Sequence, residues 1–348
     1  MFELVSRRKA FKLLFNRGFQ VLIGIVSGSL LSCYSQKTTS LIKQPRQGGV
    51  ELLNESGNFL IELKKIKKFA LPKNSNLYQP PTTNDLESFK VLANALISLD
   101  IDTALNKASD INYELVRFVD TPTQQVLYGL REKHIDNYPM RGWGSYFINV
   151  SYKTDALIEI PHILFDLFSE EIGAKVFLMS AARGVLIAGA HRNANGTGTA
   201  DVCNPIKSIF QEVHKAWVLS KTKTWQIHGF SISTKSKLPV STQSVLSSGQ
   251  SNVSTEVLDL SKRMNNRGFL THIYNKLSGS ALLNQLVNQN VAGTAFSHLG
   301  ATENVQGIYC RSLGNPFIHV ELDKSIRFST TERDVVARVI ADSIEAVT

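Results

Sequence analysis

From Gly142 to the C-terminus, short apolar runs of strand length alternate with longer stretches whose apolar residues recur at helical spacing. This β-α-β-α order predicts an α/β domain whose mixed or mostly parallel sheet is flanked by helices. The chain has 348 residues, of which 43% are apolar, which is enough for one large domain with a core. We predict strands at 146–150, 156–160, 184–188, 225–227 and 316–322, and helices at 163–181, 205–219 and 331–346.

The chain before Gly142 has a different character. Residues 34–81 are polar, with one apolar patch at 59–63 that allows a short strand, and we predict that they form a tether. An apolar pattern beginning at Asn84 or Asp85 predicts a capped helix, and a second helix is expected near 105–118. The predicted units are therefore the tether, a small helical element at 82–141, and an α/β domain at 142–348 in which the polar stretch 231–254 faces solvent.

The first 33 residues have the order of an export signal, a basic start followed by a short apolar run. The run has about a dozen residues, whereas a membrane-spanning helix needs roughly 20, so a permanent transmembrane anchor is not expected. Leu30-Leu31-Ser32-Cys33 resembles the lipobox of bacterial lipoproteins, and Arg7-Arg8 resembles a twin-arginine signal, which leaves both export routes open. We predict a lipidated Cys33 and a place in the cell envelope, on the outer side of the cytoplasmic membrane or in the periplasm; the alternative is an uncleaved amphipathic helix.

The charge of the chain limits its partners. The net charge of +9 becomes +5 without residues 1–33, which hold five basic residues and one acidic residue. A mildly basic exported domain attracts anionic lipid headgroups or carboxylate-rich polymers. The lysines at 64–68 are not interleaved with aromatic residues, so we expect no nucleic-acid partner. Cys203 and Cys310 remain as thiols, and the sequence leaves their pairing open.

Polar residues follow several predicted strands, at the edge where α/β sheets bind ligands. His162 and Asp166 share a face if a helix begins at Pro161, and His228 follows another strand. Imidazole and carboxylate groups are zinc ligands, and catalytic zinc sites keep three protein ligands and one water. We therefore predict a zinc site formed by His162, Asp166 and His228, with Glu159 and His191 as alternates.

The motif order over residues 156–327 resembles that of the zinc-dependent amidohydrolases and carboxypeptidases, a group that includes N-formylglutamate amidohydrolase and the phage poly-γ-glutamate hydrolases. Glu159-Ile160-Pro161-His162 sits where that group has its first ligands, and His228-Gly229 is similar to its later strand-end histidine. Phe165 stands where the group's His-x-x-Glu motif has a carboxylate, which leaves Asp166 or Glu159 as the second ligand. The resemblance also implies that Glu321, in Val320-Glu321-Leu322, is the catalytic glutamate and that Arg192 and Asn195 bind the substrate carboxylate.

These features together predict an exported zinc-dependent hydrolase of amide bonds in a peptide, wall-peptide or polyglutamyl substrate that carries a carboxylate. Glu321 is expected to take a proton from the metal-bound water and pass it to the leaving nitrogen. The segment 300–307 together with Arg311 either lines the cleft, where Asn304 and Arg311 would contact substrate, or forms a set of turns. The alternative is a non-catalytic lipoprotein that captures an acidic ligand through Arg192, Asn195 and Arg311. The absence of a Gly-x-Ser-x-Gly motif argues against a serine hydrolase.

Overall fold

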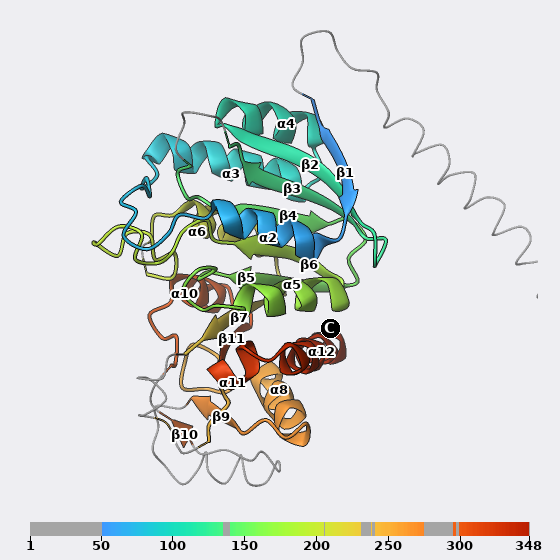
Figure 1. Cartoon of the computed structure of the whole chain (residues 1–348), viewed down its shortest axis with the longest axis vertical. Coiled ribbons are helices and arrows are strands. Elements are labelled where there is room, and N and C mark those ends of the chain that lie inside the picture. Colours follow the sequence, from blue (N-terminus) through green and yellow to red (C-terminus); the bar gives the residue numbers. More distant parts are fainter. Residues whose placement is uncertain are drawn as a thin grey trace, which may run out of the picture. The chain divides into compact units, whose positions relative to one another are not determined.

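A mixed sheet of eleven strands runs through the described part of the chain (Figure 1). Six of its ten strand pairings are parallel and four are antiparallel. The predicted fold class, an α/β fold with a mixed, mostly parallel sheet flanked by helices, is confirmed. The strands are β1 (Leu53–Gly57), β2 (Tyr113–Asp120), β3 (Val126–Glu132), β4 (Ser145–Asn149), β5 (Thr154–Ile160), β6 (Ala182–Ile187), β7 (Lys223–Gly229), β8 (Ser244–Ser247), β9 (Thr271–Tyr274), β10 (Ala295–Phe296) and β11 (Phe317–Leu322), in the spatial order β1-β2-β3-β4-β6-β5-β7-β11-β8-β9-β10.

The structure is a computed structural model that describes residues 51–134, 140–204, 206–230, 238, 241–274, 295–296 and 299–347. The predicted signal, the lipidation site Cys33 and the first part of the predicted tether lie outside these residues. In the described part, no helix is both long and apolar enough to cross a membrane.

Helices cover both faces of the sheet (Figure 1). The helices are α2 (Phe59–Phe69), α3 (Thr83–Ile97), α4 (Ile101–Asp110), α5 (Ser169–Met179), α6 (Ile209–Trp217), α8 (Thr255–Asn266), α10 (Val305–Ser312), α11 (Lys324–Arg327) and α12 (Thr330–Ala346). Buried side chains of α2, α5, α8 and α12 join one core cluster, and those of α3, α4, α6 and α10 join the other. The central strands β5, β6, β7 and β11 are buried almost throughout, as expected for parallel strands covered on both sides.

The region before Gly142 differs from its predicted organisation. Residues 52–348 form one compact unit, in which β1 and β2 pair with each other and β3 pairs with β4. The segment 82–141 is therefore not a separate helical element, and the described part of the predicted tether forms β1 of the sheet and helix α2. These strands extend the sheet by long-range backbone pairing, which a local sequence pattern does not reveal.

Two local predictions in this region were wrong. The apolar patch at 59–63 is the first turn and a half of α2, because the Asn58 side chain accepts the N–H of Leu60 and so caps a helix there. The helix predicted near 105–118 ends at Asp110, because Asn112 adopts a left-handed conformation (φ 56°) and β2 begins directly after it.

The later part of the chain also departs from prediction at two places. The described part of the stretch 231–254 includes β8, which is buried because it lies between β11 and β9. The predicted helix at 163–181 begins at Ser169 as α5, after turns at 161–168. That segment of turns carries part of the candidate site.

Candidate metal centre

Three neighbouring parallel strands, β5, β7 and β11, bring the candidate site together at their carboxyl ends. His162 lies two residues after the end of β5, and His228 is the second-last residue of β7. Glu321 on β11 is the register partner of His228. Between β5 and α5 the chain makes one helical turn, in which Asp166 donates its backbone N–H to the His162 carbonyl at 2.9 Å. This turn returns the Asp166 side chain to the side of His162, the shared face that the i, i+4 spacing predicts.

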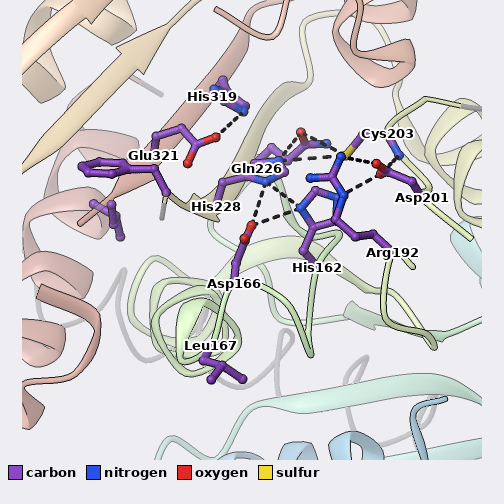
Figure 2. A network of polar contacts seen from close by, with 12 residues as sticks. His162, Asp166, Leu167, Arg192, Asp201, Cys203, Gln226, His228, His319 and Glu321 are labelled. Carbon is purple, nitrogen blue, oxygen red and sulfur yellow. Dashed lines mark hydrogen bonds and ion pairs between the residues drawn. The ribbon is translucent and has the colours of Figure 1, made fainter. Parts of the chain in front are cut away.

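The side chains of His162, Asp166 and His228 converge on one point (Figure 2). The two Nδ1 atoms lie 3.1 Å apart, and Asp166 Oδ2 lies 3.1 Å from His162 Nδ1 and 3.0 Å from His228 Nδ1. Ligands of a tetrahedral zinc ion, at bond lengths of about 2.0–2.1 Å, lie about 3.3–3.4 Å apart. The three atoms are thus spaced slightly more tightly than the ligands of such an ion, and the donor set of two imidazoles and one carboxylate fits it.

The far nitrogen of each ring has its own acceptor. His162 Nε2 donates to Asp201 Oδ1 at 3.0 Å, and His228 Nε2 donates to Gln226 Oε1 at 2.8 Å. In neutral imidazole only one nitrogen carries hydrogen, so these bonds leave the lone pair of each Nδ1 free for a cation. Acceptors behind histidine ligands orient the rings and raise their basicity in metal sites.

Asp201 is itself held in place. Its carboxylate forms an ion pair with Arg192 and accepts a hydrogen bond from Asn204 Nδ2 at 2.9 Å. A second set of potential ligands, His162, Asp201 and Cys203, also lies within 4.8 Å. Because Asp201 already has these cationic and polar partners, the first set is the better candidate for binding a cation.

The electrostatics of the site call for positive charge. Burial raises the pKa of Asp166, but His162 and His228 outweigh burial and hold the pKa of that carboxyl well below its usual range. Burial lowers the pKa of His228, and the hydrogen bond to Asp166 together with the nearby Cys203 raises it to about 9. The same balance of burial against Cys203 and Asp166 raises the pKa of His162.

Glu321 faces the same centre from β11. Ligand atoms of Glu321, His319 and His228 lie within 4.8 Å of one another, and His319 Nε2 is 3.6 Å from Glu321 Oε1 (Figure 2). Burial raises the pKa of Glu321 to about 7 despite the opposing effect of His228. Among the residues that the structure describes, Glu321 Oε2 has no hydrogen-bond partner. A carboxylate in this state can exchange protons near neutral pH.

The two alternate ligands lie elsewhere. Glu159 points into the core, where its Oε1 is 2.7 Å from His214 Nδ1, so it is not a ligand. Glu159 points into the core because of its position in β5, where side chains alternate between the two faces of the sheet. His162 comes after the strand has ended and does not share this face. His191 Nδ1 accepts the backbone N–H of Asn193 at 2.9 Å, which removes that nitrogen from the metal site.

The predicted substrate contacts are mostly engaged in other ways. Asn195 Nδ2 donates to the Tyr78 carbonyl, and Arg311 Nη2 donates to the Thr302 carbonyl. Asn304 caps α10 and donates to Gln226 Oε1 at 2.7 Å. The turn interpretation of 300–307 therefore fits these contacts better than a cleft lining. Arg192 pairs with Asp201, yet its side chain stays 31% exposed and lies over the ring of Phe165.

The sequence prediction gave no role to Asp201, Gln226, His214 or Cys203. One signal was present for Gln226, which lies two residues before His228 and therefore on the same face of β7. Cys203 and Cys310 are both buried and do not form a disulfide with each other. Each lies beside a different histidine. Cys203 Sγ lies 4.0 Å from His228 Nε2, and Cys310 Sγ lies 3.7 Å from His214 Nε2.

Comparison with known proteins adds little to this picture. No protein-family model matches the chain, and no curated protein sequence matches it. Three solved structures are similar at low levels. A gene product of Agrobacterium tumefaciens has 8% identity and a TM-score of 0.35, covering 57% of this chain and 92% of its own. A carboxypeptidase A candidate of Shewanella denitrificans has 11% identity and a TM-score of 0.33 over 58% and 60% of the two chains. A metallo-carboxypeptidase of Burkholderia cenocepacia has 9% identity and a TM-score of 0.34 over 78% and 70%. Likeness at this level says nothing about the chemistry of the site.

Proposed function

We propose that this protein is a metal-dependent hydrolase of amide bonds, with zinc bound by His162, Asp166 and His228. The observation that carries the proposal is the convergence of three ligand atoms within 3.1 Å, with an acceptor behind each histidine. When bound, zinc supplies Lewis acidity and lowers the pKa of its water toward 7. The fold itself does not define this activity, because α/β sheets carry many chemistries.

Glu321 serves as the general base in this proposal. Its carboxylate lies within 4.8 Å of a ligand atom of His228, and burial brings its pKa to about 7. It accepts a proton at Oε1 or Oε2 from the attacking water and returns that proton to the leaving nitrogen. A group whose pKa lies near the working pH can perform both transfers.

Arg192 is the proposed contact for a carboxylate-bearing substrate. One of its amino groups pairs with Asp201, and the exposed part of the guanidinium keeps further N–H donors available. The exposed apolar side chains of Phe165 and Leu167 flank Asp166 and give this side of the site an apolar character. An N-acyl amino acid or a peptide with a free carboxylate would match both features.

We also propose that the chain is exported and anchored through lipid on Cys33, on the strength of the lipobox resemblance. Lys64 and Lys68, on the first described helix after that segment, are exposed and suit anionic headgroups. Cys33→Ser should shift the protein from the membrane fraction to the soluble fraction of cells and abolish labelling by radioactive palmitate. Unchanged fractionation and labelling would rule out this anchor.

Metal analysis tests the enzyme proposal. The chain from Leu52 onward, which covers the compact unit, should hold about one zinc per chain, and His162→Ala and His228→Ala should each remove it. His134→Ala, at an exposed position, is the matched control and should retain the metal. The protein should then release amine from a panel of N-acyl amino acids and γ-glutamyl peptides.

Three results would contradict the proposal. A metal-free protein that binds carboxylates without cleaving them would favour the capturing lipoprotein. Iron in place of zinc would point to oxygen chemistry, since two histidines and one carboxylate also bind non-haem iron. Zinc retained by both His→Ala variants would place the ion elsewhere.

A further inference from the structure

A buried glutamate–histidine pair is separated by one amide side chain from the proposed metal ligand His228. Glu159 on β5 and His214 on α6 are both completely buried, and Glu159 Oε1 lies 2.7 Å from His214 Nδ1. The second oxygen of the same carboxylate, Oε2, accepts a hydrogen bond from Gln226 Nε2 at 2.9 Å. Gln226 is also fully buried and is the residue whose Oε1 faces His228.

Hydrogen-bond chemistry makes this chain directional. An ionised carboxylate only accepts, so Glu159 requires the NH₂ end of the Gln226 amide to face it. The amide oxygen must then face His228, and the hydrogen that His228 donates to it must be carried by Nε2, the ring nitrogen 2.8 Å away. The Nε2–H tautomer in turn leaves the lone pair on Nδ1, the atom that points at Asp166 and His162.

We propose that Glu159 and His214 are positioning residues of the metal centre, which fix the orientation of the Gln226 amide and through it the tautomer and aim of His228. This inference rests on the proposed function, because it assigns a task to residues behind a metal ligand. Neither residue touches the ion or a substrate.

The surroundings of Gln226 agree with a positioning role. Asn304 Nδ2 donates to the same Gln226 Oε1 at 2.7 Å, and the Cys203 thiol donates to it at 3.8 Å. Together with His228 this oxygen has three donors, and the flipped amide would lose all of them. A buried ion pair by itself is weak evidence for stability, since desolvation offsets much of its attraction. The informative contact is that of Glu159 Oε2, which accepts a hydrogen bond from the Gln226 amide that orients His228.

Zinc affinity, measured by competition with a chromogenic chelator, tests the proposal in the chain from Leu52 onward. Glu159→Met removes the acceptor and should weaken zinc binding 10- to 100-fold, the usual effect of losing a partner behind a ligand. Glu159→Gln retains an acceptor oxygen for Gln226 and should restore affinity to within a few-fold of the unchanged protein. Glu132→Met is the matched control, because Glu132 is a buried glutamate that accepts backbone N–H groups of residues 141–143; it should cost stability and leave zinc affinity unchanged.

A double variant tests whether Glu159 affects zinc affinity through Gln226 or independently of it. Gln226→Met alone should weaken zinc binding by a similar factor, and adding Glu159→Met should then change it little further. If Glu159→Met does not fold, Gln226→Met alone replaces it, and unchanged zinc affinity in that variant would overturn the inference. The visible spectrum of the Co²⁺-loaded protein should shift in the Met variants and not in the Glu132 control.

Unchanged zinc affinity and an unchanged Co²⁺ spectrum in Glu159→Met, or losses that multiply in the double variant, would overturn the inference while leaving the hydrolase proposal intact. Failure of the proposed metal site has a different signature, because the unsubstituted protein would then bind no zinc at His162, Asp166 and His228. That result would overturn both.

Discussion

Single residues decide which nitrogen of each histidine can bind a metal. Asp201 and Gln226 accept from the two Nε2 atoms, and both Nδ1 atoms therefore turn toward Asp166. Asp201 is an anion and Gln226 is neutral, so the two ligands are supported differently. The carboxylate behind His162 adds negative charge to the site, whereas the amide behind His228 supplies orientation.

The first residue-scale prediction concerns Glu321. Glu321→Gln keeps the size of the side chain and removes the proton acceptor, so kcat should fall by about 10²–10⁴-fold. Zinc content should stay at the value of the unsubstituted protein, because Glu321 is not a proposed ligand. Steady-state kinetics and elemental analysis measure the two quantities, and Glu87→Gln, an exposed glutamate on α3, is the control. Loss of both quantities, or of neither, would contradict the assigned role.

The second residue-scale prediction concerns Asp201. Asp201→Ala leaves the Nε2–H of His162 without its acceptor and frees Arg192, so zinc affinity should fall by about 10- to 100-fold. Chelator competition measures the change. Asp155→Ala removes a carboxylate that pairs with Arg183 instead and should leave affinity unaltered. Equal affinities in the two variants would show that Asp201 does not support the ligand.

At the scale of elements, β3 must lie close beneath an aromatic ring. A Cβ atom added at Gly129 would overlap the ring of Phe147 on β4, which packs edge-on against Phe59 of α2 with ring centroids 5.0 Å apart. Gly129→Ala should therefore lower the free energy of unfolding by about 1–3 kcal/mol, the usual cost of overpacking. Urea unfolding measures this cost. Gly57→Ala on β1 is the control, because its Cβ would meet only Phe118 at 3.8 Å; an equal loss there would refute the packing explanation.

One arginine links four elements at the β1 edge of the sheet. Arg131 on β3 pairs with Glu55 on β1 at 2.7 Å, with Glu62 on α2 at 2.6 Å and with Glu114 on β2 at 3.1 Å. The hydrogen bond from Arg131 lowers the pKa of Glu55 below its ordinary value of 4.5. A carboxyl group whose pKa is lower in the folded state stabilises the fold above its unfolded pKa and loses that contribution as the pH falls through its folded pKa.

The resulting prediction is an acid dependence of stability. The free energy of unfolding should decline as the pH falls below about 4.5, and Glu55→Gln should make the decline shallower while lowering stability at pH 7. Urea unfolding at pH 7 and at pH 3.5 provides the comparison. An identical slope in both proteins would show that this pair contributes no acid sensitivity.

At the scale of the whole molecule, zinc should couple to folding, because its proposed ligands lie at the carboxyl ends of two strands, β5 and β7, that pair only in the folded sheet. A ligand that binds only the folded state at a free concentration of 1,000 times its Kd stabilises it by about 4 kcal/mol. Thermal unfolding should therefore occur at a higher temperature with zinc and at a lower one after chelation. His228→Ala should abolish the difference, and a zinc effect that survives in this variant would place the stabilising ion elsewhere.

Local sequence patterns were sufficient to predict those strands and helices that are specified by the apolar spacing of their own side chains. The apolar runs that form β5 and β11 predicted those strands nearly to the residue, and the α/β class followed from their alternation with helices. The sites of His162, Asp166 and His228 were also accessible, because polar residues placed directly after buried strands meet at one edge of a parallel sheet. Their convergence depends on the tertiary structure, which places the three side-chain atoms within 3.1 Å of one another.

Only the tertiary structure decided the partners of these residues. Asp201 lies 39 positions from His162, and His214 lies 55 positions from Glu159, so no local spacing relates the members of either pair. The same holds for β2, which the sequence pattern assigns to a helix and which is a strand because β1 and β3 pair with it on both sides. The short-range pattern of a chain specifies which face of a helix or strand is apolar. Which element packs against that face depends on the order in which the strands assemble in the sheet. The proposed ligands of this site were therefore accessible from the sequence, and the residues that orient them were not.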